Sequence, residues 1–213
     1  MADIRAQIPL PETADELCAV ARDLGAPESD IRLGARANER EIKRLSKSGE
    51  LASYRIVHFA THGALAGELQ VGSEPGLLLT PPDVATPEDD GHLSASEIAG
   101  LKLDADWVIL SACNTAAGEG VGGDALSGLA RGFFYAAARA PLVSHWSVDS
   151  DATVSLITRA FDALKVDPKI GRAEAMRRAM TGMIAEGGRM AHPANWALFV
   201  VVGGERRENS LNF

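Results

Sequence analysis

Residues 107–115 read Trp-Val-Ile-Leu-Ser-Ala-Cys-Asn-Thr, a run of apolar, β-favouring side chains that stops at Cys113 and then gives way to small residues. Residues 58–63, His-Phe-Ala-Thr-His-Gly, end in a similar way at His62. Parallel strands that are buried on both faces are nearly continuous apolar runs, and they deliver reactive side chains to the carboxyl edge of the sheet. The two stretches therefore predict two buried parallel strands whose exits carry a histidine and a cysteine.

Predicted strands alternate with predicted helices along the whole chain. This alternation indicates an α/β fold: a mostly parallel sheet with helices on both faces and right-handed crossovers. Hydrophobic residues make up 46% of the chain and aromatic residues only 5%, which favours helices packed closely on a sheet over a β-sandwich. No linker or repeat divides residues 1–213, so we expect a single domain. The predicted strands are 31–33, 54–61, 107–112, 141–148 and 195–202, with 77–79 as a short strand or hairpin arm. The predicted helices are 14–24, one that follows Asn38, a short one from Ser94 to 101, a segment from 124, one after 151, and 172–186.

Three helix starts carry capping signals. Thr13 with Glu16, and Ser94 with Glu97, match the capping box, in which the two side chains bond each other's backbone N–H groups. Asn38 can cap the helix that follows it, and the charge of that helix predicts a largely solvated surface. These signals fix where the helices should begin.

Two further histidines receive structural interpretations. His58 lies in the middle of a predicted strand, so we expect a buried, hydrogen-bonded ring. His92 follows the turn-forming residues Asp-Asp-Gly and is expected to be solvated. Neither histidine is assigned to the chemistry.

Charge and cysteine content exclude several function classes. The net charge of -8 gives no electrostatic footprint for nucleic acid or an anionic membrane. The two cysteines, Cys18 and Cys113, lie in unlike contexts and suggest no disulfide framework or zinc spacing; Cys18 reads as a packed helix residue. The glycines after Cys113 match neither the P-loop nor the dinucleotide fingerprint. We therefore expect no cofactor and no metal.

The N-terminus lacks a basic segment followed by an apolar run, and no apolar stretch approaches the roughly 18 residues that span a bilayer. These two features predict a soluble, cytoplasmic protein.

The chemistry that the strand exits suggest is acyl transfer by a thiol. His62 precedes Cys113 by 51 positions, close to the spacing of about 50 in caspase-type cysteine enzymes. An imidazolium or a helix dipole stabilises a thiolate, and the histidine can move the proton. The backbone N–H groups of Gly63 and Cys113 are the candidate oxyanion donors, and Gly63 is expected to let the chain turn sharply. Either residue alone reads better as structural; the pair favours catalysis.

Five stretches, in this order along the chain, resemble the CHAT domain, a caspase- and separase-like group of cysteine peptidases often attached to TPR repeats. The likeness runs over about residues 10–204. The stretches are HFATHG (58–63), DGHLSASEIAGLKL (90–103), VILSACNTAAGEG (108–120), SHWSVDSDAT (144–153) and HPANWALFVVVGG (192–204).

The resemblance implies a caspase-like three-layer α/β/α sandwich with a sheet of about six strands, and a catalytic dyad of His62 and Cys113. Members of the family usually carry further strand-forming sequence upstream, so part of the N-terminal sheet edge is expected to be missing from this chain. The resemblance also implies a TPR or other regulatory partner, fused or bound.

In caspase-like folds the segment after the later strand pairs with the substrate peptide, which agrees with the physics of β-augmentation. The candidate substrate-binding residues are therefore Ser144, His145, Trp146, Ser147, Asp149 and Asp151. Relatives commonly have leucine at the position of His145. Trp146 reads equally well as a pocket wall or as a core residue. Asp149 or Asp151 would accept a basic P1 side chain, as in separase-like and clostripain-like relatives; alternatively Asp151 caps the following helix.

The sequence as a whole predicts a cysteine endopeptidase that cleaves a protein or peptide substrate through a thioester acyl-enzyme. Two alternatives stay open: a catalytically silent interaction or scaffold module with the same fold, and a thiol hydrolase such as an amidase that acts on other substrates.

Overall fold

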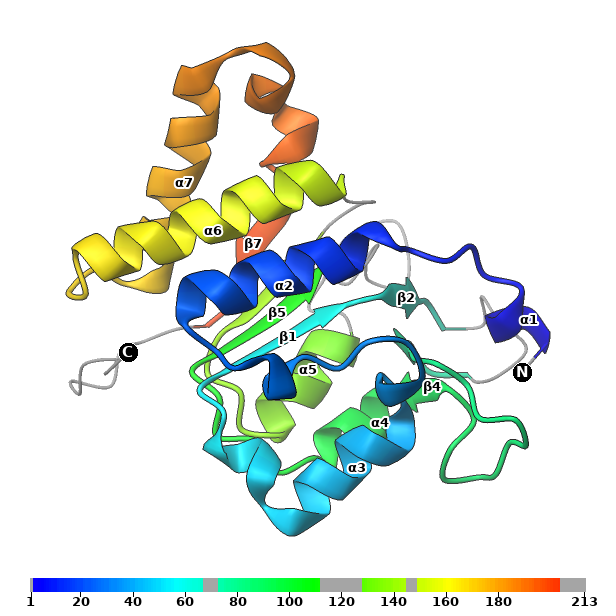
Figure 1. Ribbon diagram of the computed structural model, residues 1–213. Coiled ribbons are helices and arrows are strands. Elements are labelled where there is room, and N and C mark those ends of the chain that lie inside the picture. Colours follow the sequence, from blue (N-terminus) through cyan, green and yellow to red (C-terminus); the bar gives the residue numbers. More distant parts are fainter. Residues whose placement is uncertain (1, 67–72, 112–127, 145–148, 204–213) are drawn as a thin grey trace.

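A computed structural model describes residues 2–66, 73–111, 128–144 and 149–203. Its centre is a four-stranded sheet with the order β1-β5-β6-β7 (Figure 1). The first three strands run parallel and β7 runs antiparallel to β6. The prediction of an α/β fold with a mostly parallel sheet is confirmed. The strands are β1 (Ile56–Ala60), β5 (Trp107–Ser111), β6 (Pro141–Ser144) and β7 (Phe199–Val201).

Alternating side chains of β5 explain how the sheet is covered on both faces. Val108 and Leu110 point into a core formed with α3, α4 and α5, whereas Trp107 and Ile109 point into a core formed with α2, α6 and α7. Figure 1 shows these two groups of helices on opposite sides of the main sheet. The helices are α1 (Ala2–Arg5), α2 (Glu12–Leu24), α3 (Glu39–Ser48), α4 (Ala95–Ala99), α5 (Gly128–Tyr135), α6 (Ser150–Val166) and α7 (Arg172–Glu186), with 3-10 turns at Glu28–Asp30, Gly34–Arg36, Glu50–Ser53, Gly188–Ala191 and Pro193–Asn195.

A second, antiparallel sheet of three strands lies beside the main one; of its strands the sequence predicted only the segment 77–79. Its order is β2 (His62–Ala64), β3 (Gly76–Leu78) and β4 (His92–Ser94). The chain bends at Thr61, so β2 leaves the main sheet as soon as β1 ends. Within the described residues β1 pairs only with β5 and forms one edge of the main sheet.

Several local predictions are wrong for identifiable reasons. Residues 31–33 join two 3-10 turns and form no strand, and β7 covers only the end of the predicted 195–202 strand. The Thr13 capping box does not form: α2 begins after Pro11, and the Thr13 hydroxyl donates to the Leu10 carbonyl at 2.7 Å. Glu16, its expected partner, is turned into the core instead.

His92, expected in solvent, is buried in β4 opposite Leu78. Gly76 of β3 makes room for its ring, because a Cβ at Gly76 would lie 2.4 Å from His92 Nε2 and 2.7 Å from the Leu93 carbonyl oxygen. We expect Gly76→Ala to lower the free energy of unfolding by about 2–3 kcal/mol, since the backbone of β4 cannot move away. Gly171→Ala is the control, because a Cβ there meets nothing within 4 Å. Equal urea midpoints for the two variants would contradict this explanation.

Burial also makes His92 sensitive to pH. Desolvation lowers the pKa of His92 below its ordinary value of 6.5, while the Asp90, Glu97 and Glu74 carboxylates act in the opposite direction. The unfolded chain therefore binds this proton more readily than the folded protein does, so stability is fully present above about pH 6.5 and is lost as the pH falls through the folded pKa. We expect His92→Gln to flatten the pH dependence of urea unfolding below about pH 6.5. An unchanged slope in the variant would show that His92 is not the group responsible.

Candidate active site

The register of the two central parallel strands brings the two sequence motifs to the same end of the main sheet. Ala60, the last residue of β1, lies opposite Ser111, the last residue of β5. His62 follows Ala60 by two positions, and Cys113 follows Ser111 by two positions. Cys113 lies outside the described residues, so its contact with His62 stays a prediction.

His62 is half-buried at the start of β2, and one of its ring nitrogens is already engaged. Its Nε2 lies 2.8 Å from the backbone carbonyl oxygen of Ile8. A carbonyl oxygen can only accept, so Nε2 carries a hydrogen and donates it. The neutral ring therefore keeps Nδ1 as its basic nitrogen, which is the atom that could take a proton from a thiol. Sequence reasoning missed this partner, because a backbone carbonyl leaves no residue signature.

Gly63 continues β2 opposite Leu77, so the prediction of a sharp turn at this glycine is wrong. The bend comes earlier, at Thr61, whose hydroxyl donates to the carbonyl of Leu78 in β3. This bond anchors the bend between the two sheets. The assignment of the Gly63 N–H as an oxyanion donor stays a prediction.

His58 is buried and hydrogen-bonded, as predicted. Its Nε2 lies 2.9 Å from Ser111 Oγ, and the same nitrogen lies 2.9 Å from Glu16 Oε1. The contact joins β1, β5 and α2 just inside the sheet end that leads to His62.

A cavity of about 740 Å³ runs along the free edge of β1, between α2, α3 and the N-terminal segment. All five β1 residues line it, and His62 lies on its wall together with Ile8. Apart from the two histidines, Gln7, Tyr54 and a few threonine and charged side chains, its lining is apolar. This size lies within the range of about 300–1,000 Å³ of small-molecule sites.

The described substrate-binding candidates have partners within the protein. Ser144 is buried at the end of β6 opposite Phe199. Asp149 is the N-cap of α6, since its Oδ1 accepts from the Ala152 N–H at 2.9 Å, so the alternative that Asp151 is the cap is wrong.

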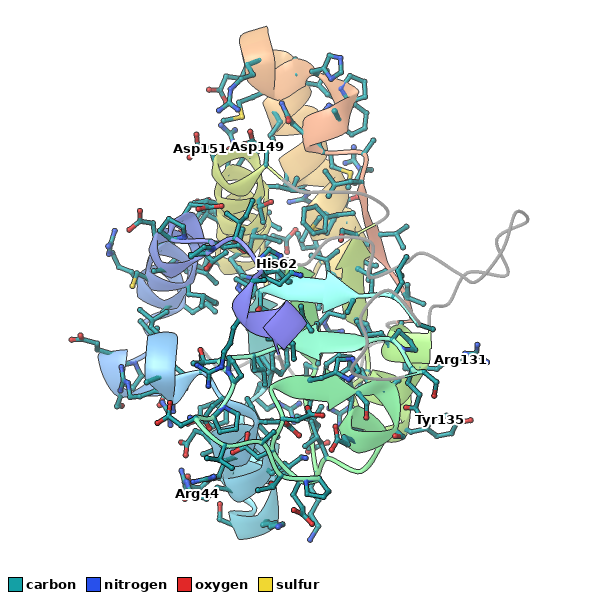
Figure 2. All side chains as sticks on the ribbon, turned by 90° about the vertical axis from the view of Figure 1, so that its right-hand side faces the viewer. Arg44, His62, Arg131, Tyr135, Asp149 and Asp151 are labelled. Atoms are coloured by element: carbon teal, nitrogen blue, oxygen red, sulfur yellow. The ribbon has the colours of Figure 1, made fainter. Side chains whose placement is uncertain are left out.

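Arg189 bridges the two exposed aspartates: its Nη1 lies 2.7 Å from Asp149 Oδ2 and its Nη2 lies 3.2 Å from Asp151 Oδ2. Both carboxylates lie above His62 in the view of Figure 2. A basic substrate side chain would compete with Arg189 for them. The other candidates, His145, Trp146 and Ser147, lie outside the described residues.

The described residues contain no group of three or more side chains suited to hold a metal ion, and none of their helices is long and apolar enough to cross a membrane.

Comparison with known proteins points to one family. The family model described as CHAT domain matches residues 4–204. Tetratricopeptide repeat protein 28 of Mus musculus is 26% identical over 237 residues, and that of Homo sapiens is 25% identical over 231 residues. Each alignment covers 95% of this chain and 9% of the relative, so the chain corresponds to a small part of those proteins.

Proposed function

Because the chain belongs to the CHAT domain family, we propose that it is a caspase-like cysteine endopeptidase with a dyad of His62 and Cys113. The observation that carries the proposal is the engaged ring of His62, which stands at the exit of a parallel strand with Nε2 bound to Ile8. This contact orients the ring and leaves Nδ1 as the base. A three-layer caspase-like architecture, with the described sheet as its centre, is part of the same proposal.

In the proposed reaction His62 Nδ1 takes the proton of the Cys113 thiol, and the sulfur attacks the scissile carbonyl carbon. The resulting oxyanion is stabilised by backbone N–H groups, for which Gly63 and Cys113 are the candidates. The imidazolium then gives its proton to the leaving amine, and a thioester remains on Cys113. Water, activated by the same nitrogen, hydrolyses the thioester and restores the thiol.

The imidazolium formed during this cycle has a ready acceptor for its second N–H. Nε2–H keeps its hydrogen bond to the Ile8 carbonyl while Nδ1 takes up and releases the proton. The N-terminal segment thus keeps the ring oriented throughout the cycle.

For the substrate we propose an extended peptide that runs along residues 144–149. The residues next to it would be Ser144, His145, Trp146 and Ser147. Asp149 and Asp151 would bind a basic P1 side chain once Arg189 moves away from them. A TPR segment is the proposed regulatory partner, since two relatives are named as tetratricopeptide repeat proteins.

The test is hydrolysis of a peptide panel with basic, apolar or acidic P1 residues by the wild type and by Cys113→Ala. We expect turnover of at least one class by the wild type and none by the variant. Cys18→Ala is the matched control and should retain full activity. Equal turnover by wild type and Cys113→Ala would overturn the proposal.

A further inference from the structure

A buried polar cluster connects α2 with both strands that lead to the proposed dyad. Glu16 comes from α2, His58 from β1 and Ser111 from β5, and His58 Nε2 lies 2.9 Å from an oxygen of each of the other two. Glu16 is 1% exposed, Ser111 is 2% exposed and the His58 side chain is 7% exposed. The three side chains are thus largely removed from bulk water and lie against one another.

Two contacts of the cluster meet at His58 Nε2. Only Ser111 Oγ has hydrogen-bond geometry to this nitrogen, while the Glu16 oxygens have no hydrogen-bond partner among the described residues. Ser111 is thus the hydrogen-bond partner of His58, and Glu16 lies against the same ring nitrogen.

Core filling alone does not account for these side chains. The surrounding residues on this face of the sheet, such as Val20, Ile56 and Ile109, are apolar. Apolar residues of similar volume would fill the same space without the cost of removing a carboxylate from water, and such replacements are often neutral or stabilising. Unlike apolar packing, the polar contacts depend on direction, so the cluster fixes α2 at one position relative to β1 and β5.

The two strands that the cluster joins lead directly to the two catalytic candidates. Ser111 precedes Cys113 by two positions, and His58 precedes His62 by four. The segment that leads into α2 also holds His62 directly, through the Ile8 carbonyl. Residues 8–16 therefore contact both the ring of His62 and the strand that leads to it, at His58. His58 in turn contacts Ser111, which leads to Cys113.

We propose that Glu16, His58 and Ser111 are positioning residues, which fix the exits of β1 and β5 and the N-terminal half of α2 so that His62 Nδ1 meets the Cys113 thiol. The kinetic part of this inference rests on the proposed function; the orientation of the His62 ring is measurable without it.

The first experiment compares Glu16→Gln with Glu39→Gln in the intact chain. Glu39 is a carboxylate of equal burial, 1% exposed, on the opposite face of the sheet. Two quantities are measured: the tautomer of His62 from ¹⁵N shifts of its ring, and the iodoacetamide alkylation rate of Cys113 by mass spectrometry with Cys18 as internal reference. We expect Glu16→Gln to mix the His62 tautomers and to slow alkylation about 10- to 100-fold, the effect of a small misplacement of reacting groups. Glu39→Gln should change neither quantity.

The second experiment uses Ser111→Ala, a smaller change, with Ser111→Thr as the rescuing variant, because threonine keeps the hydroxyl. Ser111→Ala should repeat both effects and Ser111→Thr should restore them. The positioning role would be overturned if Glu16→Gln and Ser111→Ala both gave the wild-type His62 tautomer and the wild-type alkylation rate. It would also be overturned if Glu39→Gln changed these two quantities as much as Glu16→Gln does. If Cys113 of the wild type reacts no faster than Cys18, the proposed function fails, and the ¹⁵N measurement alone decides this inference.

Discussion

His62→Gln is expected to lower kcat/KM for the best peptide of the panel by about 10²- to 10⁴-fold, the usual contribution of a positioned general base. Glutamine keeps a similar length and can still donate to the Ile8 carbonyl, so the N-terminal segment should stay in place. What is lost is a titrating nitrogen, and with it the proton transfer from the thiol and to the leaving amine. Steady-state kinetics from pH 5 to 9 would measure the loss.

His192→Gln is the control for this prediction. His192 is exposed and caps the 3-10 turn Pro193–Asn195, far from His62 in the sequence. It should keep wild-type kcat/KM. A His62→Gln enzyme within threefold of the wild type, with unchanged pH dependence, would remove His62 from the mechanism.

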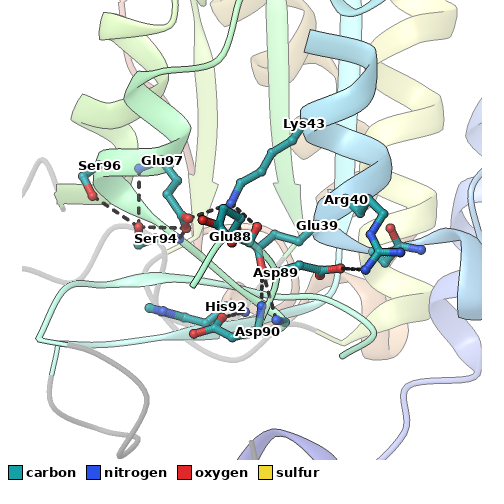
Figure 3. A network of polar contacts seen from close by, with 12 residues as sticks. Glu39, Arg40, Lys43, Glu88, Asp89, Asp90, His92, Ser94, Ser96 and Glu97 are labelled. Atoms are coloured by element: carbon teal, nitrogen blue, oxygen red, sulfur yellow. Dashed lines mark hydrogen bonds and ion pairs between the residues drawn. The ribbon is translucent and has the colours of Figure 1, made fainter. Parts of the chain in front are cut away.

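The second large effect concerns stability. Lys43→Met is expected to lower the free energy of unfolding by about 3–5 kcal/mol, because it leaves Glu39 buried without its cation. Lys43 Nζ forms ion pairs with Glu39 and with Glu97, the latter at 2.7 Å, and donates to the Glu88 carbonyl at 2.7 Å (Figure 3). Burial already raises the pKa of Glu39 against the effect of Lys43. Urea denaturation at pH 7 would measure the change.

Glu39 also accepts hydrogen bonds from the backbone N–H groups of Asp90 and Gly91, at 2.9 and 3.1 Å, so it fixes the turn that leads into β4. We expect the double variant Glu39→Gln/Lys43→Met to regain part of the stability, since no uncompensated charge remains. Arg177→Met is the surface control: its ion pair with Glu174 is exposed and screened by solvent, so little stability should be lost. A loss for Lys43→Met as small as for Arg177→Met would contradict the role given to burial.

The fold could be predicted where a signal lies within a few residues. The cap at Asn38 and the capping box of Ser94 with Glu97 form as expected, and the helix at 172–186 has the predicted bounds. Apolar runs likewise located β1, β5 and β6. These elements depend on local hydrogen bonds and on periodicity, which a single sequence carries.

The sequence predictions fail where a partner that is distant in the sequence determines whether a side chain is buried. Glu16 leaves its capping box because His58 of β1 holds its carboxylate in the core, and Glu39 is buried because Lys43 and the turn at Asp90 satisfy it. His92 is buried because Gly76, far away in sequence, leaves space for the ring. No periodicity predicts such pairings.

In the candidate site, too, some features could be predicted from the sequence and others could not. The exit of β1 at His62 and the matching end of β5 at Ser111 follow from the apolar runs, and the register of the two strands agrees with them. The Ile8 carbonyl beside His62 and the Arg189 guanidinium between Asp149 and Asp151 could not be foreseen, because both come from segments remote in sequence. They are also the groups that orient the proposed base and compete for the proposed P1 site.

The most direct test of the proposed dyad is to identify the residue that becomes acylated. The wild type and His62→Gln are mixed with an activated peptide ester, quenched with acid and digested, and the modified peptide is located by mass spectrometry. We predict a hydroxylamine-sensitive adduct on Cys113 in the wild type, none on Cys18, and little or none in His62→Gln. Peptide turnover without an adduct on Cys113, or equal acylation of Cys113 in the His62→Gln variant, would contradict the proposed dyad.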